Sequence, residues 1–264
     1  MTKIMTRNTG ILLLALLVSL LVVSGCQKEQ APTETVSGPA ATTPAPAVKI
    51  DPATVASVSG TIKFTGTPPK AGKIDMSQDP NCAATASGPN TAETVMVEAG
   101  NLANVFVYVK EGFAGTTPAP AEAATIDQHG CRYHPHVLGV VAGQTIKILN
   151  SDNTTHNIHP TPKTNREWNE SQAPKATPLE KSFPREEVML AVKCNQHPWM
   201  KMYVNVVKHG FFAVTDKDGK FEIKGLPPGD YTIAAVHEKF GEQTMKVTIG
   251  AKEAKTAEFT FKGQ

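Results

Sequence analysis

Cys194, His197 and Met200 stand three residues apart in the segment VKCNQHPWMKMYV, residues 192–204. A thiolate, an imidazole and a thioether form a donor set suited to a soft, redox-active metal ion, because soft sulfur ligands select copper. Two imidazoles, one thiolate and a weak axial thioether make the blue-copper arrangement, which carries single electrons. The segment supplies one imidazole, and the best candidate for the second is His156 in ILNSDNTTHNIHP. These four residues predict one copper site.

Zinc binding and ordinary core packing are the alternatives to copper at this cluster. Zinc also accepts cysteine and histidine, but methionine is a poor zinc ligand, so the full set favours copper. Methionine and cysteine are also ordinary core residues, and their spacing alone is compatible with packing between a strand and a loop. The histidine in the context NSDNTTHN, residues 150–157, makes packing alone the weaker alternative.

Short strands are the elements that must hold these ligands. From residue 57 onward, short, β-branched and roughly alternating segments are separated by clusters of Gly, Pro, Asn and Asp. This pattern is typical of sandwiches and barrels, and no long stretch shows helical periodicity with caps. We therefore expect an all-β protein with little helix. Residues 113–124 have the composition of a linker, and residues 160–182 form a long polar loop, which indicates a functional or mobile segment.

The segment HPHVLGVVAGQTIKILNSDNTTHNIH, residues 134–159, resembles the first half of a cupredoxin. In that family a strand, a Gly-centred turn and a second strand ending in Asn, here Asn150, lead to the first histidine ligand. The segment CNQHPWM resembles the ligand loop that closes the fold, in the short form seen in amicyanin. The resemblance covers residues 124–207 and implies a Greek-key β-sandwich.

The same resemblance implies a role for each ligand. His156 and His197 would bind copper through imidazole nitrogen, Cys194 through its thiolate and Met200 through an axial sulfur. Asn157, which follows the first histidine, would hydrogen-bond the backbone of the ligand loop. Fixed ligands reorganise little as the metal changes charge, so electron exchange is fast.

The segment FFAVTDKDGKFEIKGLPPGDYTIAAVHEKFG, residues 211–241, resembles the carboxypeptidase regulatory-like, or transthyretin-like, β-sandwich. Residues 208–264 alone are short for such a sandwich, and its first strands have counterparts before residue 124. We therefore expect one sandwich from residues 57–123 together with 208–264, with the copper domain, residues 124–207, inserted into it. A strand VSGTIKF that pairs only with strands of the copper domain would indicate two domains in series instead.

The N-terminus predicts export. Residues 1–25 hold two positive charges and an apolar run, as a secretory signal does. The segment VSGC resembles the lipobox of bacterial lipoproteins, in which the cysteine, here Cys26, is lipidated. Gln27 favours outer-membrane sorting, and residues 26–56 have the composition of a Pro/Ala/Thr-rich tether on the periplasmic side or the cell surface. Without residues 1–25 the chain has 24 basic and 24 acidic residues, which argues against a nucleic-acid partner.

The remaining cysteines and histidines are expected to be structural. Cys82 and Cys131 are the two spare thiols of an exported protein, so a disulfide is expected, with free thiols or a second metal site as alternatives. His129, His134 and His136 flank Cys131; we expect His136 to be structural, again with a second metal site as the alternative. His159 is expected to be a loop residue and not a ligand.

These features predict a periplasmic, lipid-anchored electron carrier that docks briefly with redox proteins. The edge of His197, beside Pro198 and Trp199, would be the electron port. We find no catalytic motif such as GxSxG or HExxH, so the chain is not expected to be an enzyme. A cell-surface module that binds protein or carbohydrate, and a copper storage or delivery protein, are the alternatives.

Overall fold

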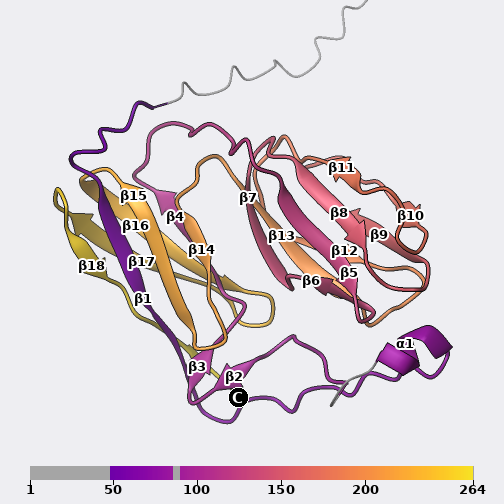
Figure 1. Ribbon diagram of the computed structural model, residues 1–264. Helices are drawn as coiled ribbons and strands as arrows, with labels where there is room; N and C mark the ends of the chain where they lie inside the picture. The colour runs from indigo at the N-terminus through magenta and orange to yellow at the C-terminus, as the bar shows by residue number, and fades with distance from the viewer. Residues whose placement is uncertain (1–47, 86–89, 264) are drawn as a thin grey trace, which may run out of the picture. The chain divides into compact units, whose positions relative to one another are not determined.

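The computed structural model describes residues 48–85 and 90–263, and within them the fold is almost entirely β, which confirms the predicted fold class (Figure 1). The predicted signal peptide, Cys26 and most of the predicted tether lie outside the described residues. The end of that tether does not: Val48 and Ile50 pack against the core of the folded body. Among the described residues, no helix is long and apolar enough to cross a membrane.

Two groups of strands make up the described body. The first comprises β1 (Ala56–Thr65), β2 (Val97–Glu98), β3 (Asn101–Leu102), β4 (Phe106–Glu111), β14 (Phe212–Val214), β15 (Lys220–Leu226), β16 (Gly229–His237), β17 (Gly241–Ile249), β18 (Ala254–Thr256) and β19 (Phe259–Lys262). The second comprises β5 (Ala124–His129), β6 (Arg132–His134), β7 (Val137–Val141), β8 (Ile146–Asn150), β9 (His156–Thr161), β10 (Glu170–Gln172), β11 (Leu179–Lys181), β12 (Glu187–Lys193) and β13 (Lys201–Val207). A short helix, α1 (Pro80–Thr85), precedes β2.

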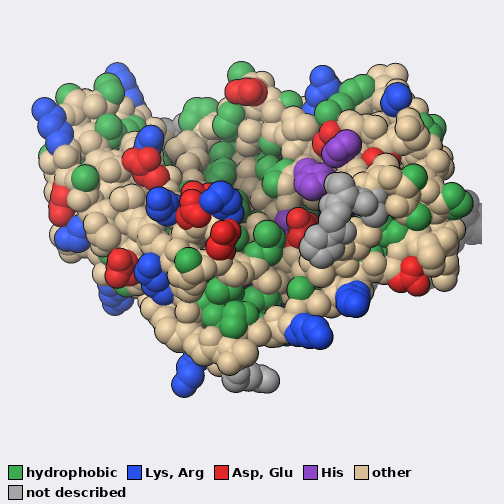
Figure 2. All heavy atoms as spheres, turned by 60° about the horizontal axis from the view of Figure 1, so that its bottom comes forward, with side chains coloured by type: hydrophobic (Ala, Val, Ile, Leu, Met, Phe, Trp, Pro, Cys, Tyr) green, Lys and Arg blue, Asp and Glu red, His purple; other side chains and the backbone are tan. Residues whose placement is uncertain are grey.

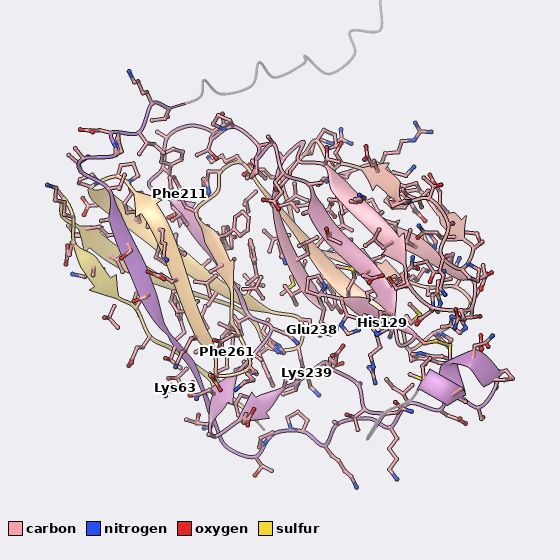
Figure 3. All side chains as sticks on the ribbon, viewed as in Figure 1. Lys63, His129, Phe211, Glu238, Lys239 and Phe261 are labelled. Atoms are coloured by element: carbon pink, nitrogen blue, oxygen red, sulfur yellow. A yellow bond between two sulfur atoms is a disulfide. The ribbon has the colours of Figure 1, made fainter. Side chains whose placement is uncertain are left out.

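The first group forms two sheets around one core. One sheet runs β15-β1-β3-β2, with β18 and β19 also pairing with β1, and the other runs β14-β4-β16-β17. Their apolar side chains meet in a core that includes Phe211 and Phe261, labelled in Figure 3. Strand β1 is antiparallel to β15 and parallel to β18 and β19, so it pairs with strands that follow residue 207. An insertion of residues 124–207 requires this pairing, and two domains in series do not.

The second group forms the sandwich that carries the predicted ligands. Its sheets run β10-β9-β12-β13-β7 and β11-β8-β5-β6. In β8, Ile146 and Ile148 are buried and Lys147 between them is exposed, as the two-residue period of a half-buried strand requires. The core between the sheets also receives Met76 and Cys82 from the segment around α1.

Strands β10 and β11 correct one expectation. The polar loop at residues 160–182 was expected to lack structure of its own, but β10 pairs with β9 and β11 with β8. Both strands are only three residues long, and Leu179 is their one apolar residue, so their sequences carry no strand pattern that stands out.

The two sandwiches meet through a small apolar cluster. In β4, Val107 and Val109 point into the first core, whereas Phe106 and Tyr108 point into this cluster with Val137. A strand buried on both faces reads as a continuous apolar run, which explains the sequence FVYV. Charged side chains of both signs lie between hydrophobic areas on the face shown in Figure 2.

Candidate metal centre

The predicted ligands lie at one end of neighbouring strands. His156 is the first residue of β9, and Cys194 follows the last residue of β12, Lys193. These strands pair antiparallel, with Lys193 opposite His159, so their ends bring His156 and Cys194 together. The loop after Cys194 folds back on itself, since the backbone N–H of Met200 donates to the carbonyl of His197 at 2.9 Å.

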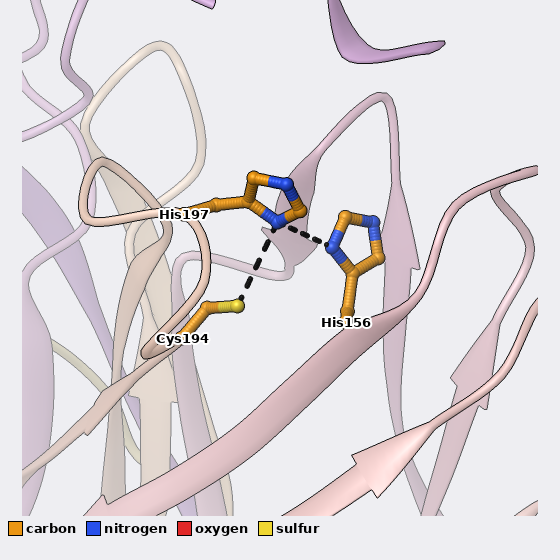
Figure 4. Close-up of side chains that lie close together, drawn as sticks. All are labelled: His156, Cys194 and His197. Atoms are coloured by element: carbon orange, nitrogen blue, oxygen red, sulfur yellow. Dashed lines mark hydrogen bonds between the residues drawn. The ribbon is translucent and has the colours of Figure 1, made fainter. Parts of the chain in front are cut away.

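Three donor atoms converge there. Nδ1 of His156 lies 2.9 Å from Nδ1 of His197, and Sγ of Cys194 lies 3.7 Å from the same His197 nitrogen (Figure 4). His156, Cys194 and His197 are 0%, 2% and 5% exposed. Met200, the predicted axial ligand, is 1% exposed and belongs to the same apolar core as Cys194.

A carboxylate fixes the far nitrogen of each imidazole. Nε2 of His156 lies 2.8 Å from Oδ2 of Asp152, and Nε2 of His197 lies 3.0 Å from Oδ2 of Asp79. A carboxylate accepts hydrogen bonds, so each Nε2 carries a proton, and Nδ1 is the nitrogen left to bind a metal. Histidine ligands of metals characteristically donate their other N–H to a carboxylate in this way. Two Nδ1 atoms and a thiol sulfur that face one another fit a copper ion, which would replace the proton shared between the two imidazoles.

Charge at the centre favours a thiolate. Burial opposes ionisation of Cys194, but His156 and backbone N–H groups around the ligand loop outweigh burial and lower the pKa of the thiol. Burial also opposes the charged form of His156, yet Asp152 and Cys194 raise its pKa to about 9. The metal-free centre therefore stabilises a proton on the imidazole and negative charge on the sulfur and on Asp152.

Asn157 and Asn150 hold the two loops of the centre. Oδ1 of Asn157 accepts a hydrogen bond from the backbone N–H of Asn195 at 2.7 Å, the contact that the cupredoxin resemblance implies. Nδ2 of Asn150 donates to the carbonyls of Thr154 and Gln172, both at 2.9 Å. Asn150 thus shapes the turn that precedes His156.

Asp79 and Asp152 are the functional residues that sequence reasoning missed. Asp152 stands four residues before His156 within the motif already singled out, so its spacing was a usable signal. Asp79 stands 118 residues from His197, and no local pattern links the two. Burial opposes ionisation of Asp79, but hydrogen bonds from the backbone of Cys82 and from Thr154 and His197 lower its pKa.

The predicted disulfide between Cys82 and Cys131 is present. It joins α1 to the turn between β5 and β6, beside the metal centre. Sγ of Cys82 lies 3.7 Å from Nε2 of His197, and the backbone N–H of Cys131 donates to Asp152 at 2.7 Å. The bridge therefore contacts the surroundings of both imidazoles.

The predicted electron port combines the edge of His197 with Pro198 and Trp199. Asp79 and Cys82 cover the edge of His197, which is 5% exposed. Pro198 is exposed and Trp199 is partly exposed, so these two residues carry the accessible apolar part of the loop, next to the exposed polar Asn195 and Gln196. The indole N–H of Trp199 donates to the carbonyl of Cys131 at 3.0 Å.

The remaining histidines of this sandwich lie outside the three-ligand cluster. His159 contacts Asn195 at 3.0 Å and Glu167 at 2.6 Å. His129 and His134 are exposed, whereas His136 is buried beside Glu238.

A model of the carboxypeptidase regulatory-like domain matches residues 197–262, which confirms the resemblance seen in residues 211–241. No curated protein matches the chain.

Solved structures similar to the chain include copper proteins. A purple cupredoxin from Nitrosopumilus maritimus is similar over 31% of this chain and 98% of its own, with 24% identity and a TM-score of 0.27. An oxidised amicyanin variant is similar over 38% of this chain and 97% of its own, with 19% identity and a TM-score of 0.30. The nitrite reductase NirK from Thermus scotoductus SA-01 is similar over 38% of this chain and 25% of its own, with 18% identity and a TM-score of 0.30. Residues 197–262 of this chain thus match the carboxypeptidase regulatory-like family, and cupredoxins are among the solved structures that resemble it.

Proposed function

We propose that the protein is an exported, lipid-anchored type 1 copper protein that carries single electrons and is not itself an enzyme. The observation that carries the proposal is the convergence of Nδ1 of His156, Nδ1 of His197 and Sγ of Cys194 within a buried cluster. Bound copper would supply the one-electron couple. Export and lipidation rest on the sequence of residues 1–26 alone.

The residues around the ligands suit fast electron exchange. Asp152 and Asp79 fix the planes of the two imidazoles, and Asn157 fixes the ligand loop. Burial of His156 and Cys194 keeps water from the donors. A centre held in this way changes little in geometry when its charge changes.

The accessible loop residues suit a transient partner. Pro198 and Trp199 form a small, largely apolar surface next to His197 and Met200. Small contacts of this kind dissociate quickly, as electron-transfer encounters require. We therefore infer docking of redox proteins at Pro198 and Trp199.

The visible and electron paramagnetic resonance spectra of the copper-loaded protein test the proposal. We expect an intense blue or purple colour from thiolate-to-copper charge transfer, and its loss in Cys194→Ser. The control is His159→Gln, which changes a histidine of β9 outside the cluster and should keep the colour. A colourless protein that binds only copper(I) would indicate storage or delivery. Absence of stoichiometric copper would leave a binding module built on the carboxypeptidase regulatory-like domain.

A further inference from the structure

A second group of potential ligands lines a cavity of about 130 Å³ beside the ligand loop. Its walls come from four parts of the chain: the segment before β2, β6 with the residues that follow it, the ligand loop with the start of β13, and the turn between β16 and β17. The residues that matter here are Glu93, Arg132, His136, Trp199, Lys201 and Glu238. Glu238, labelled in Figure 3, follows the last residue of β16.

The orientation of the His136 ring follows from Glu238. Nε2 of His136 lies 2.5 Å from Oε1 of Glu238. Glu238 also accepts from the hydroxyl of Tyr203; burial and this carboxylate raise the pKa of Tyr203 to about 12. Because a carboxylate accepts, Nε2 of His136 carries a proton, so Nδ1 of the neutral ring presents its lone pair.

Nδ1 of His136 is a buried acceptor that lacks a hydrogen-bond partner among the described residues. His136 is only 8% exposed, so bulk solvent does not satisfy this nitrogen. Oε2 of Glu93, which is another acceptor, lies 3.8 Å from this nitrogen, and the Glu93 side chain is partly buried. Two acceptors that face each other away from bulk water repel unless a proton or a cation lies between them.

We propose that a divalent transition-metal ion binds between Nδ1 of His136 and the carboxylate of Glu93. Glu238, His136 and the ion would then form the carboxylate–histidine–metal arrangement that is typical of protein metal sites. Imidazole with carboxylate suits Zn²⁺ and Cu²⁺, and the cavity leaves room for water to complete the coordination. This site differs from the cluster of His156, Cys194 and His197 and does not depend on the proposed copper function.

Two basic residues set the strength of the site. Nη1 of Arg132 lies 4.0 Å from the same oxygen of Glu93, and Lys201 also lines the cavity. Their charge opposes a cation, so the ion is exchangeable and is not a permanent structural metal. The three segments that supply Glu93, His136 and Glu238 belong to different parts of the fold, so a bound ion would tie them together.

Zn²⁺ binding to the copper-loaded protein tests the proposal, because Zn²⁺ does not displace the more tightly held Cu²⁺. We expect one Zn²⁺ per chain by calorimetric titration and elemental analysis, and a higher unfolding temperature with Zn²⁺. His136→Gln should lose both effects. The matched control is His134→Gln, an exposed histidine two residues away, which should keep both.

A second variant keeps the test valid if His136→Gln does not fold. Glu93→Gln leaves the contact between His136 and Glu238 intact and should weaken Zn²⁺ binding at least about tenfold. Equal Zn²⁺ affinity in wild type, His136→Gln and Glu93→Gln would overturn the proposal, and so would the absence of Zn²⁺ binding. Either result would mean that water or a second proton satisfies Nδ1.

The two proposals can fail separately. If the protein takes up no copper, the same titration is made in Cys194→Ser and in Cys194→Ser/His136→Gln. One Zn²⁺ more in the single variant than in the double variant supports the His136 site even though the copper proposal has failed. Equal binding in both variants contradicts the His136 site.

Discussion

Asp79 and His197 form one contact at 3.0 Å between residues that lie 118 positions apart in the chain. The same carboxylate accepts from the backbone N–H groups of Asn81 and Cys82, at 2.8 and 3.1 Å, at the start of α1. It also accepts from the hydroxyl of Thr154 at 2.9 Å. One side chain therefore caps a helix, anchors the loop before β9 and orients a candidate metal ligand.

Replacing Asp79 tests this triple role. Asp79→Ala removes the cap and the partner of His197, so we expect a loss of about 1–2 kcal/mol in the free energy of unfolding. Copper affinity should fall about 10- to 100-fold, because the imidazole loses its orienting carboxylate. Denaturant unfolding and competitive copper titration measure the two effects.

Asp75→Ala is the control for this variant. Asp75 accepts from the backbone N–H of Ser77 at 2.9 Å, a comparable local bond, but it contacts no histidine. Its copper affinity should equal that of the wild type. If Asp79→Ala also keeps full affinity, His197 is oriented by the ligand loop alone.

The disulfide should contribute strongly to stability. Cys82 and Cys131 are 49 residues apart, and the chain-entropy model gives about 4 kcal/mol for a loop of this size. We expect Cys82→Ser/Cys131→Ser to lose about 2–4 kcal/mol of unfolding free energy in urea, measured on copper-free protein. A loss below about 1 kcal/mol would contradict the prediction and mean that α1 stays docked without the bridge.

The hydrogen bonds of the Glu187 carboxylate predict that the fold loses stability in acid. Its carboxylate accepts from Lys163 N, from Thr164 N and Oγ1, and from Asn165 N and Nδ2. Burial opposes its ionisation, but these bonds lower its pKa to about 2 from 4.5. A carboxyl group whose pKa is lower in the folded protein than in the unfolded chain stabilises the fold at pH values above its unfolded pKa. This stabilisation is lost as the pH falls toward its folded pKa. We expect a loss on the order of 2–3 kcal/mol between pH 4.5 and pH 2.

Urea unfolding at several pH values in this range measures the effect. Glu187→Gln should be less stable at pH 6 and should show a flatter dependence on pH below 4.5. Glu186→Gln, one residue away, is the control. The Glu186 carboxylate accepts one exposed hydrogen bond, from the backbone N–H of Lys208, so this variant should keep the wild-type slope. Identical slopes in wild type and Glu187→Gln would assign the acid sensitivity to other carboxylates.

A substitution at Gly139 tests how tightly the two sandwiches pack against each other. A Cβ at this position in β7 would lie 2.5 Å from Cε2 of Phe212 and 2.8 Å from Cε2 of Phe106. Rings packed in an interface cannot both move away, so Gly139→Ala should lower stability by about 1–3 kcal/mol in thermal unfolding. Gly72→Ala has open space around its Cβ and should be neutral. A neutral Gly139→Ala would show that the interface is loosely packed.

The sequence predicted the three residues of the candidate centre that strand ends and the ligand loop supply, and it did not predict the contacts that distant segments add. His156, Cys194 and His197 were found because strand ends and a short loop place them by local rules. Asp79 was not found, because its place depends on the folding of a distant segment onto the sandwich. The burial of His197 was not predicted for the same reason, since Asp79 and Cys82 cover it.

Strand prediction succeeded where apolar residues recur and failed where they do not. Alternation in β8 and continuous apolar sequence in β4 reflect burial on one face and on two faces. Strand β10 is held by its pairing with β9 and by the hydrogen bonds of Gln172, and β11 by its pairing with β8 and by one apolar side chain, Leu179. Their sequences ESQ and LEK therefore resemble loops.

The pairing of β1 sets an order for folding during synthesis. Among the described strands, those between residues 124 and 207 pair only with one another, so this sandwich can form as soon as β13 has emerged. Strand β1 is made earlier, but its main partners β15, β18 and β19 are made last. Apart from its short pairing with β3, β1 lacks partners until residues 208–264 are made, and we expect the closing of this long-range pairing to be the slow step. Truncation after β13 should therefore leave a folded metal centre joined to an unpaired, aggregation-prone strand.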